Sequence, residues 1–297
     1  MKNKKEKKQI APNECSLKRW IAVLVTGLVI GLTLDIPLNP YMENRVDSIM
    51  GISYADFFGV LSFIPLFLGM TLALWLVGKT SLKNFILGVG GTVNKKVCLT
   101  VLGIFAAGFA IPYLLTASNL RLRGVEAGQF AFLILFMLLT TWIQTTWEEL
   151  VFRGLFIRWA CKNNVGYTKK ALITGAVSSL AFALSHVANP EVTSQSGFGI
   201  LLAVAAYTIP GFVCYLADLH FGSLLPGIIV HWLNNFILFT LVSSEVSAAA
   251  LPTLLIDTTP NHAAWMLGST ALAYLPLLVY ILWDGKKRTA LPLSQNT

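Results

Sequence analysis

Long apolar runs separated by short polar segments recur along the whole chain. A helix that crosses a bilayer needs about 20 mainly apolar residues, and eight runs approach or exceed that length. The first begins at Trp20, and the other seven are Phe57–Gly78, Val97–Ser118, Ala127–Ala160, Ala171–Asn189, Gly197–Ala217, Gly222–Ser243 and Ala263–Trp283. The pattern predicts an all-α polytopic membrane protein of about eight transmembrane helices.

Composition points to the same class. Of the 297 residues, 55% are hydrophobic and only 12% are charged, whereas a soluble domain carries about 25% charged residues. We expect one transmembrane domain over residues 20–285, between a basic tail at 1–19 and a second tail at 286–297.

Lysine and arginine are distributed unevenly between the runs. The N-terminal tail holds seven, the segment 79–96 four, the segment 153–170 five and the C-terminal tail three, nineteen in all, against three in the alternate loops. Under the positive-inside rule this predicts that both termini are cytoplasmic, in a multi-pass protein of the cell membrane. The net charge of +8 then reflects topology and attraction to anionic lipid. We expect the bilayer as a partner, and no nucleic acid.

Two adjacent carboxylates, Glu148 and Glu149, end a stretch from Ala127 to Trp147 that has no charged residue. A charge at the bilayer centre costs about 2.5–3.5 kcal/mol on insertion scales, so such residues usually face a protein interior and have partners. On a helix Glu149 and Arg153 share a face and can pair. Glu148 is rotated away by about 100° and has no such partner nearby in the sequence.

Two later runs carry polar residues one helical turn apart. Phe182 and His186 share a face in one run, and His231 and Asn235 share a face in another. Singly, each has a packing explanation, because His and Asn often bond helices together. Jointly with Glu148, they are what three helices would supply to one polar cavity. Matching their depths requires a fourth helix that continues past Glu148 through Arg153, which the apolar pattern up to Ala160 permits.

These residues carry a resemblance to a known family. The patterns are E-E-x-x-x-R, F-x-x-x-H and H-x-x-x-N, in this order on three hydrophobic helices, formed by Glu148, Glu149, Arg153, Phe182, His186, His231 and Asn235. Together they resemble the CPBP family, which comprises the CAAX type II (Ras-converting) prenyl proteases and their bacterial Abi or bacteriocin-immunity relatives. The similarity covers a core of about residues 127–243.

The resemblance implies an intramembrane endopeptidase with catalytic residues Glu148, His186, His231 and Asn235. By analogy, Glu148 and His186 would hold and deprotonate a water, and His231 and Asn235 would stabilise the oxyanion. Glu149, Arg153 and Phe182 would support them. The family is often labelled metalloprotease, and Glu148, His186 and His231 could ligate zinc with an open position. Because H-E-x-x-H is absent and Asn is a poor zinc ligand, we favour a mechanism without a cofactor, with zinc as the alternative.

Other classes of function remain open. Buried Glu and His also build transporters and proton relays, which often show two related halves with discontinuous helices; no such symmetry is evident here. A non-catalytic scaffold or immunity protein would keep the cavity without turnover. The expected substrate is a membrane-associated peptide or protein. A basic, cytoplasm-facing architecture is typical of bacteria, where prenylated CAAX proteins are generally absent, so the family's best-known substrate is not expected.

Overall fold

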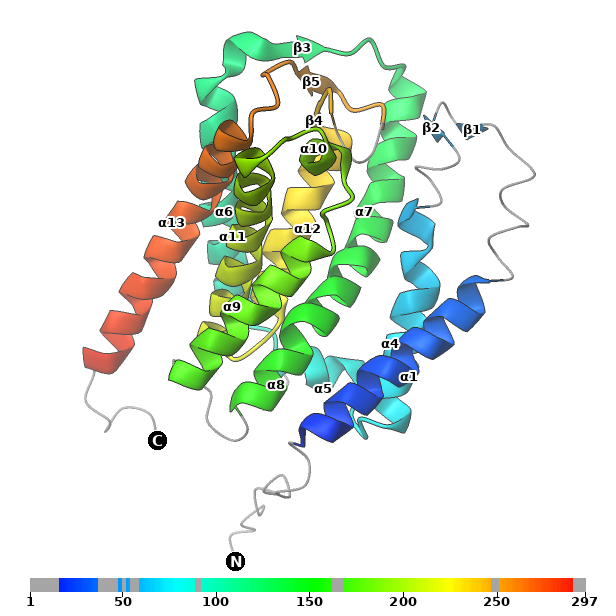
Figure 1. Ribbon diagram of the computed structural model, residues 1–297, viewed down its shortest axis with the longest axis vertical. Helices are drawn as coiled ribbons and strands as arrows, with labels where there is room; N and C mark the ends of the chain where they lie inside the picture. The colour runs from blue at the N-terminus through cyan, green and yellow to red at the C-terminus, as the bar shows by residue number, and fades with distance from the viewer. Residues whose placement is uncertain are drawn as a thin grey trace, which may run out of the picture.

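Long helices running side by side make up most of the molecule in the computed structural model (Figure 1), which describes residues 16–36, 48–49, 52–53, 59–88, 92–161, 168–246 and 251–290. The helices are α1 (Leu17–Asp35), α4 (Phe63–Leu76), α5 (Leu82–Leu87), α6 (Lys95–Leu115), α7 (Ala127–Glu149), α8 (Leu155–Cys161), α9 (Lys169–Leu184), α10 (Pro190–Thr193), α11 (Phe198–Phe221), α12 (Leu225–Thr240) and α13 (Ala263–Ala290). The predicted tails lie largely outside this range, since residues 1–15 and 291–297 are not described.

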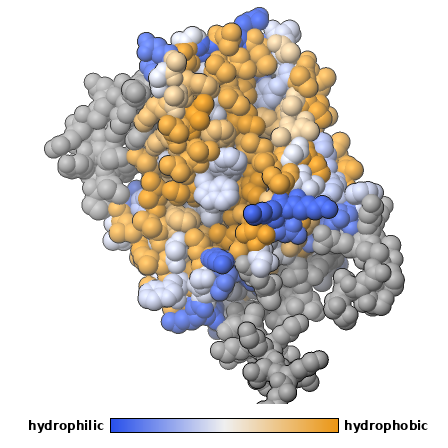
Figure 2. All heavy atoms as spheres, turned by 180° about the vertical axis from the view of Figure 1, so that it is seen from behind, coloured by the Kyte–Doolittle hydropathy of each residue, from blue (hydrophilic) through white to orange (hydrophobic). Residues whose placement is uncertain are grey.

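Within the described ranges, six helical segments are long and apolar enough to cross a membrane. They are Leu17–Asp35, Gly59–Leu76, Lys95–Leu115, Ala127–Ala160, Phe198–Phe221 and Ala263–Gly285. Apolar residues also cover most of the face shown in Figure 2, where hydrophilic residues gather toward the two ends. The prediction of an all-α, multi-pass membrane protein is confirmed.

Two predicted spans are shorter than expected. The runs Ala171–Asn189 and Gly222–Ser243 yield α9 and α12, each of 16 residues, or about 24 Å of helix. Helix α9 ends at Leu184, and the chain then turns through Ser185 to Asn189 before Pro190 begins α10. Helix α12 packs against α6, α7 and α11, so three longer helices shield it from lipid.

The predicted long fourth helix is confirmed. Helix α7 passes directly into a π-helical turn at Leu150–Gly154 and then into α8, so one helical rod carries the chain from Ala127 to Cys161. A π turn holds an extra residue and often occurs at a functional site. Here it follows Glu148 and Glu149 immediately, and Arg153 lies within it.

Helix α12 is anchored at its first turn by a buried carboxylate of α11. Asp218 Oδ1 accepts a hydrogen bond from the backbone N–H of Gly227 at 2.7 Å. A Cβ atom at Gly227 would lie 2.6 Å from Asp218 Oδ2, so only glycine permits this approach. The bond satisfies one of the free N–H groups of a helix start and fixes the helix on which His231 lies.

Short strands cap one end of the bundle, and the sequence did not predict them. Strands β3 (Leu120–Leu122) and β4 (Val242–Ser244) both pair with β5 (Leu255–Asp257), β3 antiparallel and β4 parallel. This end, called the sheet end below, is opposite the end where α1 begins and α13 finishes (Figure 1). A separate two-stranded pair joins β1 (Ser48–Ile49) to β2 (Ile52–Ser53).

Candidate active site

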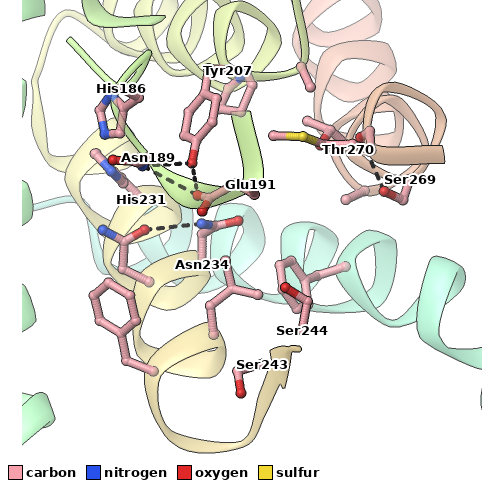
Figure 3. Close-up of a pocket in the computed structure, with 18 of the residues that line it drawn as sticks. His186, Asn189, Glu191, Tyr207, His231, Asn234, Ser243, Ser244, Ser269 and Thr270 are labelled. Carbon is pink, nitrogen blue, oxygen red and sulfur yellow. Dashed lines mark hydrogen bonds between the residues drawn. The ribbon is translucent and has the colours of Figure 1, made fainter. Parts of the chain in front are cut away.

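A cavity of about 750 Å³ occupies the half of the bundle nearer the sheet end. Its walls come from α4, α6, α7, α9, α11, α12, α13 and the loops that carry the strands. All four residues predicted to be catalytic line it: Glu148, His186, His231 and Asn235. Figure 3 shows His186 and His231 next to each other at this cavity. The structure therefore brings together side chains from α7, from the turn after α9 and from α12, which span 87 residues of sequence between Glu148 and Asn235.

The predicted pair of Glu149 and Arg153 lies behind the cavity wall. Arg153 Nη1 is 3.3 Å from Glu149 Oε1, and the two side chains are 1% and 0% exposed. The Arg153 Nε–H also donates to the carbonyl of Gly211 at 3.5 Å. Neither charge reaches the cavity, so the pair supports the site and does not contact a substrate.

His231 lies between the two adjacent glutamates. Its Nδ1 is 2.8 Å from Glu149 Oε1, and its Nε2 is 3.3 Å from Glu148 Oε2. An ionised carboxylate only accepts hydrogen bonds, so the Nδ1–H donates to Glu149 and the ring is fixed. Glu148 has no basic partner nearby in the sequence, and His231 on α12 provides one. Its Oε1 also accepts from Gln144 Nε2 at 3.3 Å.

His186 lies just beyond the end of α9, in a turn and not on the predicted helix. Its Nδ1 is 2.8 Å from the carbonyl oxygen of Phe182, which only accepts, so Nδ1 carries the proton. The other nitrogen, Nε2, is then left with a lone pair. The ring packs against Phe182 at 4.5 Å and stacks on Tyr207 at 4.7 Å between ring centroids.

Phe182 joins the two parts of the site. Its ring meets the ring of His231 edge-on at 5.5 Å, in addition to its contact with His186. The guanidinium carbon of Arg153 lies 4.2 Å from the centre of the same ring, a cation–π distance. One buried aromatic side chain therefore sets the spacing between both histidines and the supporting ion pair.

Asn235 is oriented by its neighbour. Asn234 Nδ2 donates to Asn235 Oδ1 at 3.1 Å, and both side chains line the cavity. With its oxygen engaged, Asn235 keeps its Nδ2–H groups for another acceptor. The sequence prediction did not include Asn234, although the adjacent amides on an apolar helix are a visible signal.

Comparison with known proteins identifies the segment that holds these residues. The model of the family described as type II CAAX prenyl endopeptidase Rce1-like matches residues 130–237. This segment is an Rce1-like domain. The Rce1-like domain contains all seven residues of the predicted motifs, and the predicted resemblance to the CPBP intramembrane protease family is confirmed.

A curated relative gives weaker information. The uncharacterized protein YyaK of Bacillus subtilis (strain 168) is 25% identical over 177 residues, which is 60% of this chain and 56% of that protein. The match therefore spans little more than half of the relative, and its name carries no activity to transfer.

The Rce1-like domain also holds a polar network that the sequence prediction missed. Asn189 Nδ2 donates to the hydroxyl of Tyr207 at 2.9 Å and to Glu191 Oε1 at 3.3 Å, and the Tyr207 hydroxyl donates to the same oxygen. All three residues line the cavity beside His186 (Figure 3). Glu191 lies in the short helix α10, between two apolar runs of the sequence, where a carboxylate is ordinary, so nothing in the sequence marks it.

The alternative zinc set does not fit this arrangement. Glu148, His186 and His231 are three possible ligands, but in the described part of the chain no three or more His, Cys, Asp or Glu side chains gather in a way that could hold a metal ion. Both nitrogens of His231 face carboxylates. The mechanism below is therefore derived from the side chains of the Rce1-like domain alone.

Proposed function

We propose that this protein is an intramembrane endopeptidase that hydrolyses a peptide bond of a membrane-associated substrate with an activated water. One observation carries the proposal: His231 is held between Glu149 and Glu148 at the wall of a cavity that His186 and Asn235 also line. Membership of the Rce1-like domain in a peptidase family supports the same reaction.

Glu148 is the proposed general base. A water in the cavity donates one hydrogen bond to the Glu148 carboxylate and one to the Nε2 lone pair of His186. Glu148 takes the first proton as the water oxygen attacks the carbonyl carbon of the scissile bond, and the carbonyl oxygen becomes an oxyanion. Positioned acid–base groups of this kind typically contribute 10²–10⁴-fold to rate.

His231 and Asn235 are the proposed oxyanion donors. Before the attack, the ionised carboxylate of Glu148 attracts the Nε2–H of His231, so this donor is not available to the substrate. Once Glu148 has taken the proton of the water, it is neutral, and the Nε2–H of His231 is released to the developing oxyanion. Asn235 donates its Nδ2–H to the same oxygen. Each such donor typically contributes 10²–10³ in rate.

Breakdown of the tetrahedral species completes the reaction. Glu148 returns its proton to the leaving nitrogen, the carbon–nitrogen bond breaks, and the oxyanion becomes the carbonyl oxygen of the new carboxylic acid. Glu149 keeps the Nδ1–H of His231 engaged throughout, while Arg153 balances the charge of Glu149. These two residues act through His231 and are positioning residues.

We further propose that both termini face the cytoplasm, because eighteen of the 22 Lys and Arg residues fall in segments on the side of the termini once the buried Arg153 is left out. The sheet end, and the half of the bundle that holds the cavity, would then lie toward the outer side of the cell membrane. The substrate would be a membrane-associated peptide that enters the cavity from that side.

The test compares cells that carry the wild-type chain with cells that carry Glu148→Gln, by quantitative mapping of peptide ends in the membrane fraction. Glu148→Gln keeps the shape of the side chain but removes the base. Glu126→Gln makes the same change at the exposed residue that precedes this helix rod and serves as the control. We expect cleaved ends with the wild type and the control that Glu148→Gln does not produce.

Identical peptide ends from all three strains would show that Glu148 is not the base. A non-catalytic scaffold or a transporter predicts that outcome, since neither function produces new peptide ends.

A further inference from the structure

Glu191 is a second carboxylate in the cavity, and its side chain is fixed in place. Its Oε1 accepts from the Tyr207 hydroxyl and from Asn189 Nδ2. Its backbone carbonyl accepts from Gln195 Nε2 at 3.3 Å and Asn261 Nδ2 at 3.2 Å. Two side chains thus hold the carboxylate and two hold the backbone, so the group is preorganised.

The other oxygen of this carboxylate has no hydrogen-bond partner among the described residues. Glu191 Oε2 is buried, although an ionised carboxylate can accept about four hydrogen bonds. Within the described ranges no Lys, Arg or His forms an ion pair with Glu191, whereas Glu148 and Glu149 each have such a partner. A buried acceptor without a partner is costly, and a donor on a bound molecule would remove that cost.

The charges around the cavity favour a positive donor. In the part of the chain that the structure describes, the lining residues include three carboxylates, Glu148, Glu191 and Asp257, but no Lys or Arg. A low-dielectric cavity with an excess of carboxylates attracts cations and repels anions. It would disfavour a substrate that places an acidic side chain or a C-terminal carboxylate beside Glu191.

Glu191 is also close to the reacting groups. The Tyr207 ring stacks on His186 at 4.7 Å between centroids, and its hydroxyl bonds to Glu191. Glu191 is therefore one aromatic side chain away from His186. An extended peptide advances about 3.3–3.6 Å per residue. If the scissile bond of a bound substrate lies at His186, a substrate side chain a few residues from that bond would therefore reach Glu191.

We infer that Glu191 is a specificity-determining residue that binds the cationic group of a lysine or arginine near the scissile bond of the substrate. The inference rests on the proposed endopeptidase function, because it assigns the substrate of that site. The cation would donate a charge-assisted hydrogen bond to Glu191 Oε2, while Tyr207 and Asn189 hold Oε1.

The test uses an array of nonapeptides in matched pairs, each pair with lysine or its uncharged analogue norleucine at one position. Binding is measured on the purified full-length protein carrying Glu148→Gln, so that turnover does not consume the peptides. We expect at least tenfold tighter binding of the lysine member at one fixed position. Adding Glu191→Gln, which keeps an acceptor for Tyr207, should abolish the difference, while adding Glu126→Gln should preserve it.

Equal binding of every lysine and norleucine pair would overturn the inference, as would a preference that survives Glu191→Gln. Loss of the preference in Asp257→Asn instead would assign it to the other carboxylate and overturn the role of Glu191. Incubation of the same array with the wild type tests the proposed function separately. Lysine-selective binding without cleavage would refute the peptidase and leave Glu191 as a cation site.

Discussion

Arg153 offers a quantitative test of the buried ion pair. We consider Arg153→Met, which keeps much of the side-chain volume but removes the charge. The Glu149 carboxylate, 0% exposed, would then retain only the bond from His231. Removal of one partner of a buried pair typically costs about 3–5 kcal/mol, so we expect the equilibrium constant of folding to fall by a factor of about 10²·²–10³·⁷.

A double variant separates charge from packing. Glu149→Gln with Arg153→Met removes both charges, and neutral replacement of a buried pair is often tolerated. We therefore expect the double variant to regain most of the stability lost in Arg153→Met, although activity stays low because His231 loses its carboxylate. Arg121→Met, at an exposed position, controls for loss of a positive charge and of one exposed hydrogen bond to the Ser118 carbonyl.

The assay is reversible unfolding of the purified protein in mixed micelles, followed by tryptophan fluorescence. Two results would refute the reasoning. If Arg153→Met were as stable as the wild type, Glu149 would not need its partner. If the double variant were less stable than Arg153→Met, the lost contacts of Arg153 with Phe182 and Gly211 would explain the effect, and the uncompensated charge would not.

Three further predictions concern mechanism and topology. On a confirmed substrate, His231→Ala and Asn235→Ala should each lower kcat by about 10²–10³, and the double variant should fall short of the product, because donors to one oxyanion act as a unit; full multiplicativity would argue against a shared oxyanion. Purified protein should carry well below one equivalent of zinc and keep its activity after dialysis against a strong chelator; stoichiometric zinc with activity restored by the metal would favour the zinc mechanism. Reporters placed after Lys287 and within the segment 79–96 should be cytoplasmic and one near Asp257 external, and an external C-terminal reporter would contradict the proposed orientation.

The sequence was informative where the relevant physics is local. Apolar run length predicted the helices, and the four-residue spacing of Glu149 and Arg153 predicted their pair. The need to match depths correctly predicted that one helix continues past Glu148. The first two inferences depend on residues within a few turns of one another, and the third also used the positions of His186 and His231 on two other runs.

The remaining features depend on long-range packing. His231 meets both glutamates because α12 packs on α7, and no local pattern indicates that its two nitrogens face adjacent residues. Helix α9 ends early inside an apolar run, where no breaking residue marks the turn at Ser185, and the sheet joins β3 to strands more than 100 residues away. The role of Glu191 depends on Tyr207, which looks like any other aromatic residue in an apolar run.

The walls of the cavity have a consequence for how such a protein can diversify. The proposed reacting groups all lie within residues 130–237, but much of the rest of the lining lies outside this segment, including Phe63, Tyr113, Asp257 and Trp265. Mutations on those outer helices and loops can reshape the space for a substrate while the reacting groups keep their geometry. Related proteins can thus differ in the peptides they accept through changes in the outer helices and loops, while the reacting groups of residues 130–237 stay the same.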